Sequence, residues 1–244
     1  MNFLKNHPFA VEAFFENSTV LTFAVSKEQL ADLIPERLVL DTYLDRWAFV
    51  AVAMVQTRNL RPKGFPEFAG LDFFLIGYRI FVRYINKAGK SLRGLYILKS
   101  ETDKKKMELM GKIFTRYNYS TTDISVHTNG NLKTISSVRS KFRVVIEKTE
   151  SDAEIPPGSP FTDWKDAKKF AGPLPNTFSY DAEKQTVLII EGVRQNWKPK
   201  PLKVISCSFE FINALNLHNP VLANAFEIEN VPYYWKKGRL EKWN

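Results

Sequence analysis

Two arginines lie in an otherwise apolar and aromatic segment of the first half of the chain. Residues 71–84 alternate in character, so Gly77, Arg79 and Arg83 share one side of an expected strand, and the more apolar side should pack against another layer. A guanidinium group is costly to bury without an acidic partner. Arg79, beside the gap that Gly77 leaves, is therefore a candidate to bind a carboxylate or other anion. The alternative is that both arginines extend into solvent.

Further side chains that could act on a ligand follow between positions 101 and 120. Glu101 could neutralise the charge of Arg79, or it could be an exposed residue at the start of a helix. Tyr117, Tyr119 and Ser120 carry hydroxyl groups that donate and accept hydrogen bonds. If the protein is an enzyme, Tyr119 or Glu101 is the expected acid–base group.

A hairpin and a helix are expected to bring these side chains together. The polar, glycine-containing turn at residues 86–90 predicts that residues 91–99 fold back on the preceding strand. The spacing of the apolar residues that follow predicts a helix leading into Tyr117. Gly111 interrupts the pattern, and close packing against a neighbouring group is the expected reason.

The remaining segments predict a sheet-rich protein, since 14% of the residues are aromatic and alternating runs recur. Tyr119 to His127 is expected to form one strand, and residues 132–138 and 141–148 a hairpin. Ser159-Pro160 and Gly172-Pro173 are expected to begin and end a further helix. The pattern indicates an α+β protein with a mainly antiparallel sheet.

Size and composition fit a single domain of residues 1–244 with a sizeable core. The one cysteine, Cys207, allows no intramolecular disulfide and favours a reducing compartment, so a cytoplasmic location is expected. Neither a signal peptide nor a run of 18 apolar residues is present, so no membrane span is expected.

The formal net charge is +9, but acidic residues are interleaved with the cations and no nucleic-acid-binding motif accompanies them. Nucleic acids and membranes are therefore not expected partners.

The sequence lacks the common motifs of nucleotide, thiol and metal chemistry. It has no glycine-rich phosphate loop, no nucleophile elbow and no paired cysteines. Its three histidines do not have the spacing of metal ligands. We therefore expect no metal and no cofactor.

The order of several motifs resembles a known family. Leu30-x-x-x-x-Pro35-Glu36-x-Leu38-x-x-Asp41 is similar to a signature near the start of acetoacetate decarboxylase-like proteins. A closer resemblance, over about residues 10–240, is to the domain of unknown function 2071 (DUF2071) family of the same superfamily. The segments that carry it are the strand around Arg79, Gly94 to Glu101, the helix into Tyr117-Asn118-Tyr119, and Arg194-Gln-Asn-Trp197.

The resemblance implies a decorated, cone-like antiparallel β-barrel with flanking helices and an internal pocket. The decarboxylase of this superfamily forms a Schiff base through a lysine whose pKa is lowered by an adjacent lysine. Those two positions fall on Tyr119 and Ser120, and neither side chain can form an imine. The helix acid and the first-strand arginine of the decarboxylase are replaced near Ile113 and Ala24, and Lys112 lies elsewhere on the helix. Schiff-base decarboxylation is therefore not expected.

Three functions remain open at this point. The first is binding of a small anionic or carbonyl-containing metabolite in the internal pocket. The second is an enzyme that acts on a keto acid through tyrosine or glutamate acid–base chemistry, and the third is a basic structural or interaction protein with a filled core. A homodimer is compatible with each. The candidate pocket residues are Arg79, Glu101, Tyr117, Tyr119, Ser120, Arg194 and Trp197.

Overall fold

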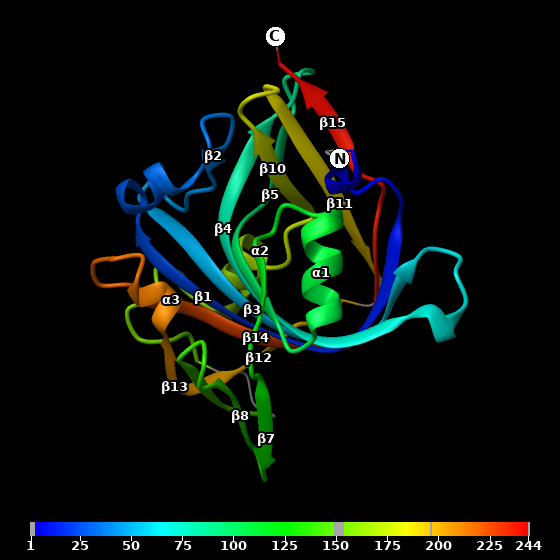
Figure 1. Ribbon diagram of the computed structural model, residues 1–244. Helices are drawn as coiled ribbons and strands as arrows, with labels where there is room; N and C mark the ends of the chain where they lie inside the picture. The colour runs from blue at the N-terminus through cyan, green and yellow to red at the C-terminus, as the bar shows by residue number, and fades with distance from the viewer. Residues whose placement is uncertain (1–2, 149–153, 196, 244) are drawn as a thin grey trace.

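The computed structural model describes residues 3–148, 154–195 and 197–243, and strands form most of its regular structure (Figure 1). Short 3-10 helices carry the label η. The elements up to the first α-helix are η1 (Leu4–Asn6), β1 (Val11–Ser26), η2 (Lys27–Leu33), β2 (Val39–Leu40), β3 (Trp47–Pro62), η3 (Glu67–Ala69), β4 (Leu71–Ile85), β5 (Ser91–Thr102) and α1 (Lys105–Phe114). The elements that follow are β6 (Tyr119–Thr121), β7 (Ser125–Asn129), β8 (Leu132–Ser137), β9 (Phe142–Glu147), α2 (Trp164–Ala171), β10 (Asn176–Asp181), β11 (Thr186–Arg194), β12 (Lys200–Pro201), β13 (Lys203–Phe209), α3 (Glu210–Asn213), β14 (Val221–Trp235) and β15 (Arg239–Lys242).

The strands form one large and one small sheet. The large sheet has the order β12-β14-β1-β3-β4-β5-β10-β11-β15, with β2 paired to β4 and β6 to β5. Because β11 also pairs with β14, the strands β14, β1, β3, β4, β5, β10 and β11 form a closed path of pairings, which we call the ring. Only the β5–β10 and β5–β6 pairs of the described sheets are parallel. The expected α+β fold with a mainly antiparallel sheet is confirmed.

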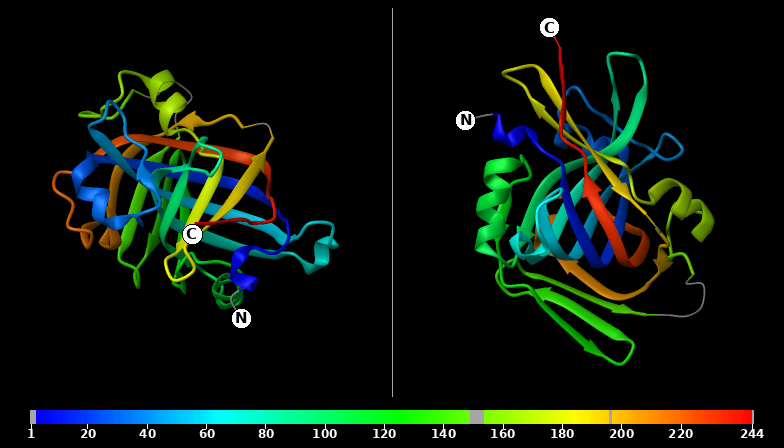
Figure 2. Two further views of the ribbon diagram at one scale, coloured as in Figure 1. Left: turned by 90° about the horizontal axis from the view of Figure 1, so that it is seen from above. Right: turned by 90° about the vertical axis from the view of Figure 1, so that its right-hand side faces the viewer.

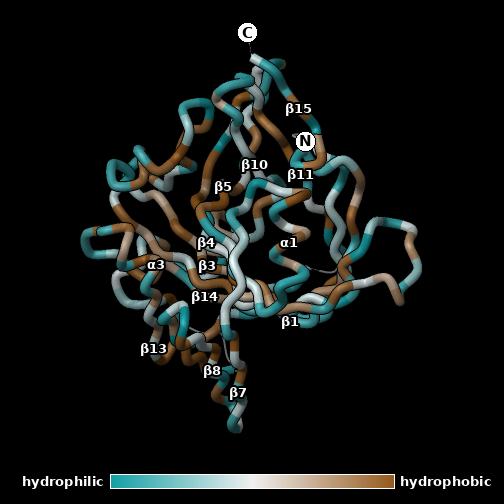
Figure 3. The backbone as a smooth tube through the Cα atoms, viewed as in Figure 1, coloured by the Kyte–Doolittle hydropathy of each residue, from teal (hydrophilic) through white to brown (hydrophobic). Residues whose placement is uncertain are grey.

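The two faces of the large sheet have different surroundings because side chains alternate along each long strand. On β4, Ile76, Tyr78 and Ile80 are fully buried in a core shared with Ile135 and Val144 of the small sheet. Full burial of one isoleucine side chain stabilises the fold by about 1.5–3 kcal/mol. The buried side chains of this layer therefore contribute much of the stability of the core. The more apolar side of the strand therefore packs against another layer, as the alternation predicts. Hydrophobic residues are concentrated in β4 and the neighbouring central strands of the large sheet (Figure 3).

The small sheet, in the order β13-β9-β8-β7, lies below the large one in the right-hand view of Figure 2. The prediction of one strand from Tyr119 to His127 is wrong, because β6 pairs with β5 in the large sheet and β7 with β8 in the small one. Between them, the Asp123 carboxylate accepts hydrogen bonds from the Arg139 N–H at 2.9 Å and the Ser137 hydroxyl at 2.6 Å. These hydrogen bonds hold the segment between β6 and β7 against the small sheet. The hairpin expected next is confirmed as β8 and β9.

Helix α1 lies beside the ring and buries Met107 and Gly111 (Figure 1). It ends at Phe114, because the backbone of Thr115 is extended. The N–H and the hydroxyl of Thr115 both donate hydrogen bonds to the Gly111 carbonyl, at 2.9 Å and 2.7 Å. Tyr117 consequently lies beyond the helix, not on its last turn.

Helix α2 begins later than the sequence predicts. Its first residue is Trp164, and the Asp163 carboxylate caps it by accepting a hydrogen bond from the Asp166 N–H at 2.8 Å. The predicted start at Ser159-Pro160 is therefore wrong, whereas the end at Ala171 agrees with the prediction. Within the three described ranges, no helix combines the length and the apolar character needed to cross a membrane.

Candidate functional site

A cavity of about 410 Å³ lies inside the ring. Each of the seven ring strands contributes at least one residue to the wall, and α1 and the segment after α2 complete it. This volume falls within the roughly 300–1,000 Å³ typical of small-molecule sites. The wall is mainly apolar, with Phe15, Val55, Phe73, Leu75, Met110 and Phe114 among its residues.

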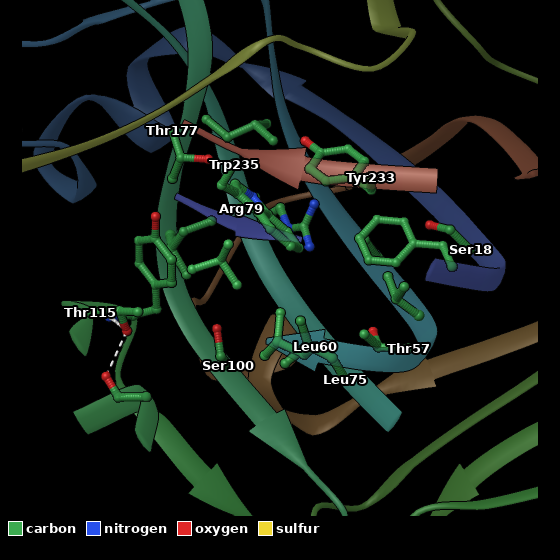
Figure 4. A pocket seen from close by; sticks show the side chains of 18 of the residues that line it. Ser18, Thr57, Leu60, Leu75, Arg79, Ser100, Thr115, Thr177, Tyr233 and Trp235 are labelled. Atoms are coloured by element: carbon green, nitrogen blue, oxygen red, sulfur yellow. Dashed lines mark hydrogen bonds between the residues drawn. The ribbon is translucent and has the colours of Figure 1, made fainter. Parts of the chain in front are cut away.

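Arg79 extends from β4 into this cavity (Figure 4). The cavity leaves part of the side chain accessible, while protein atoms enclose the rest, and burial lowers the pKa of the guanidinium below its usual value. Its Nε is buried and has no hydrogen-bond partner among the described residues. The groups that act on its charge are the hydroxyls of Tyr117, Tyr119 and Tyr233. An arginine side chain stays protonated at neutral pH even when burial lowers its pKa. The cavity therefore holds a positive charge that no carboxylate of the described chain neutralises.

Gly77 explains how the guanidinium fits against the wall. A Cβ atom at this position would lie 3.0 Å from Arg79 Nε and 3.2 Å from Nη2. The gap that the sequence predicts beside Arg79 is thus occupied by the guanidinium itself, which lies along its own strand.

The tyrosines form a hydroxyl-bearing part of the wall. Burial raises the pKa of Tyr119 to about 12 and also raises those of Tyr117 and Tyr233. The three hydroxyls are therefore protonated at neutral pH and can donate hydrogen bonds. Two glycines make room for them: Gly111 of α1 contacts the ring of Tyr119, and Gly192 of β11 contacts the hydroxyl of Tyr233. The expectation that Gly111 serves close packing is confirmed.

Arg194 and Trp197 also line the cavity, and two guanidinium nitrogens of Arg194 donate hydrogen bonds to backbone carbonyls. Its Nη2 donates to the Pro173 carbonyl at 2.5 Å and its Nη1 to the Leu174 carbonyl at 3.4 Å. Its Cζ lies 5.0 Å from the centroid of the Trp197 ring. These contacts hold the segment between α2 and β10 against β11, so Arg194 shapes the wall.

Glu101 does not neutralise Arg79, and it is not an exposed cap. Only 2% of its surface is exposed, and its carboxylate accepts hydrogen bonds from Ser140 at 2.7 Å and Tyr78 at 3.4 Å. It also forms an ion pair with Lys99 at 2.8 Å. Both readings of Glu101 from the sequence are therefore wrong.

A β-bulge explains the orientation of Glu101. Residues Leu95 and Ile97 of β5 line the cavity, so strict alternation would direct Glu101 inward as well. The register against β4 shifts after Ile97, however, and Ser100 takes the inward position instead. Since β6 pairs beside β5, Ser120 is aligned with Glu101 and stays outside the cavity lining, whereas Tyr119 is inside it.

The structure thus brings Arg79, Tyr117, Tyr119, Arg194 and Trp197 around one cavity and places Glu101 and Ser120 outside its wall. Sequence reasoning missed several polar wall residues, namely Ser18, Thr57, Ser100, Thr177 and Tyr233 (Figure 4). Alternation in the last long strand could have assigned Tyr233 to one face of β14. Only the pairing of β14 with β11 shows that this face lies opposite β4.

Among the described residues, the cavity wall contains no lysine and no carboxylate. Lys112 is exposed on the outer side of α1 and forms an ion pair with Glu108. Nor do the three described ranges contain a group of three or more histidine, cysteine, aspartate or glutamate side chains that could hold a metal ion.

Known structures share this fold. The chain is similar to acetoacetate decarboxylase from Legionella pneumophila, with a TM-score of 0.62, 10% identity, and coverage of 97% of this chain and 89% of that one. It is also similar to an acetoacetate decarboxylase-like enzyme from Sphingomonas wittichii, with a TM-score of 0.58, 11% identity, and coverage of 99% and 95%. The enduracididine biosynthesis enzyme MppR, complexed with pyruvate, matches with a TM-score of 0.55, 9% identity, and coverage of 96% and 90%. The fold is therefore that of the acetoacetate decarboxylase-like proteins.

Within that class, the sequence matches the DUF2071 family, described as an uncharacterized conserved protein, over residues 13–240. The chain belongs to the DUF2071 family, as the order of its motifs indicates. No curated protein matches the chain.

Proposed function

We propose that this protein binds a small molecule with an anionic group inside the ring, and that Arg79 holds the anion. The observation that carries the proposal is a guanidinium extended into a cavity whose described wall supplies no carboxylate. A buried cation is costly when unpaired, and an anionic ligand would provide both the missing charge and the missing hydrogen-bond acceptors.

The tyrosines would complete the site as hydrogen-bond donors. Tyr117, Tyr119 and Tyr233 act on the charge of Arg79, and their raised pKa values keep the hydroxyls protonated. A carboxylate or carbonyl oxygen next to Arg79 would therefore meet donors from several ring strands. The pyruvate complex of MppR concerns a different protein with the same fold, and it supports a keto acid only as one candidate ligand.

Native mass spectrometry of freshly purified protein tests the proposal. We expect a bound small molecule in the wild type, a weaker signal in Arg79→Lys, and loss of the signal in Arg79→Met, which keeps the volume and removes the charge. Arg58 is a suitable control because it forms ion pairs with Glu16 and Asp72 on the exposed surface. Retention of the same ligand by Arg79→Met, or no ligand in wild type together with no binding of any added carboxylate, would refute the proposal.

An enzyme that acts without a Schiff base is the second candidate. Tyr119 and Arg79 meet at one cavity, and a protonated tyrosine with a raised pKa can act as an acid on a carbonyl oxygen. Glu101 has no place in such a mechanism because it lies outside the wall. Turnover of a panel of 2-oxo and 3-oxo acids, abolished in Tyr119→Phe, would support this candidate.

Schiff-base chemistry has no support from the wall, which lacks a lysine among its described residues. We expect that borohydride reduction in the presence of acetoacetate leaves the mass of the protein unchanged. The informative measurement is intact-protein mass spectrometry, and a trapped lysine adduct would contradict the expectation.

A further inference from the structure

The charges around the cavity define the ligand more narrowly than an anion in general. Arg61 also lines the cavity, but it pairs with Glu12 at 3.0 Å and donates to two backbone carbonyls. Arg194 donates to the Pro173 and Leu174 carbonyls. Arg79 is therefore the one cation of the described wall without a hydrogen-bonding partner, and it is the group best placed to bind a carboxylate.

The apolar part of the wall is too large for a ligand that consists of little more than its anionic group. At roughly 30 Å³ for each water, 410 Å³ corresponds to more than ten water molecules. A keto acid with six or seven non-hydrogen atoms would leave most of that space unfilled. Phe73, Leu75, Met107, Met110 and Phe114 surround the remainder, and flexible methionines adapt readily to apolar ligands.

Arg79, the cation that lacks a hydrogen-bond partner, lies at one side of a mostly apolar cavity. Arg79 and Tyr233 lie together in Figure 4, whereas Leu60 and Leu75 lie on the side away from Tyr233, between Ser100 and Thr57. The wall on the α1 side is completed by Phe114 and by Met107, which packs with Phe73 and with the rings of Tyr117 and Tyr119. A ligand that pairs with Arg79 and fills the mostly apolar remainder would be charged at one end and largely apolar over the rest of its length.

We infer that the ligand is an amphipathic carboxylate, whose carboxylate group binds Arg79 and whose apolar chain or ring lies against the apolar side chains of the wall. This inference rests on the proposed function and adds the chemical class of the ligand. Each methylene group buried in such a cavity tightens binding about fourfold.

Isothermal titration calorimetry with butyrate, octanoate, acetoacetate and 1-octanol tests the inference, on protein first stripped of any retained ligand. We expect octanoate to bind about 200-fold more tightly than butyrate, because it adds four methylenes at about fourfold each. Octanoate should also bind more tightly than acetoacetate, and Arg79→Met should reduce its affinity to near that of 1-octanol. Arg58→Met should bind octanoate like the wild type, and circular dichroism should confirm that both variants are folded.

The outcomes separate this inference from the proposed function. Arg79-dependent binding of acetoacetate that equals or exceeds that of octanoate would overturn the amphipathic ligand and leave the proposed function standing. Octanoate binding that is unchanged in folded Arg79→Met would overturn both, because the anion would then not be held by Arg79. Failure of all three carboxylates to bind the wild type would overturn the amphipathic carboxylate, and it would overturn the proposed function as well if the purified wild type retains no ligand.

Discussion

At the scale of single residues, the position of Arg79 conflicts with the rule that buried charges are paired. The arginine is held on the inward face of β4 by the alternation of that strand, and its Nε has no partner among the described residues. A side chain chosen for stability alone at this position would be apolar, like Phe81 one step further along the same face. We infer that the charge is retained for the ligand and lowers the stability of the empty protein.

The first prediction follows from this cost. Arg79→Met should raise the free energy of unfolding of the ligand-free protein by about 1–3 kcal/mol, because it removes a poorly solvated charge and keeps most of the volume. Urea denaturation of ligand-free wild type and variant measures the difference. Arg79→Lys keeps the charge and should show no such gain. A clear loss of stability in Arg79→Met would mean that the arginine makes favourable contacts in the empty cavity.

At the scale of secondary-structure elements, the sequence was informative wherever side chains alternate without interruption. It assigned the two faces of β4, the hairpin to β5 and the helix α1, because a period of two or of 3.6 is visible in residue types. It could not show the bulge in β5, since one extra residue in a strand leaves the composition unchanged. That bulge decides which of Ser100 and Glu101 faces the cavity, and the strand expected from the sequence ended before both residues, at position 99, whereas β5 continues to Thr102.

Asp41 connects three elements and gives the second prediction. Its fully buried carboxylate accepts hydrogen bonds from Arg83 Nε at 2.5 Å on β4 and from Arg93 Nε at 2.6 Å on β5. Asp41→Asn should lower the free energy of unfolding by about 2–3 kcal/mol, somewhat less than for a fully buried pair because both arginines keep contact with water. Thermal and urea denaturation of the wild type and Asp41→Asn measure this change in the free energy of unfolding.

A matched control is available on the surface. Asp45 pairs with Lys27 at 2.8 Å, but 88% of its side chain is exposed. Asp45→Asn should therefore change the stability by less than about 1 kcal/mol. Equal effects of the two substitutions would contradict the structural role of Asp41.

His7 gives the third prediction, for the segment that follows η1. The side chain is 8% exposed, it lines the cavity, and burial lowers its pKa below the usual 6.5. In the unfolded chain, His7 takes up a proton as the pH falls through about 6.5, whereas in the folded protein it stays neutral until a lower pH. The unfolded state then binds more protons, so stability should decline as the pH falls from about 6.5 toward the lowered folded-state value.

The measurement compares variants across pH. The free energy of unfolding between pH 7.5 and 5 should fall less steeply in His7→Gln than in the wild type, provided that both are folded at pH 7.5. His127 is exposed on β7, so His127→Gln serves as the surface control for the loss of a histidine side chain. Parallel slopes for wild type and His7→Gln would show that the histidine does not titrate differently in the two states.

At the scale of the whole molecule, the cavity depends on strands that are far apart in the sequence. The ring closes where residues 192–194 of β11 pair with residues 233–235 of β14. This short contact places Tyr233 opposite Arg79 of β4, which lies far earlier in the chain, and so completes the group of hydroxyls around Arg79. Local patterns cannot predict such a closure, which explains why Tyr233 was missed while Arg79, Tyr117 and Tyr119 were selected.

A substitution at Gly192 tests whether the pairing of β11 with β14 determines the position of Tyr233 in the cavity wall. An added Cβ at this position would meet the Tyr233 hydroxyl, so Gly192→Ala should lower the free energy of unfolding by about 1–3 kcal/mol through overpacking and should weaken ligand binding. In Tyr233→Phe, the atom that the new methyl group meets first is absent, and the same glycine substitution should cost clearly less. A double-mutant cycle of stability and carboxylate affinity measures this coupling. Additive effects of the two substitutions would show that the ring can close without this contact and that the position of Tyr233 is set by other parts of the fold.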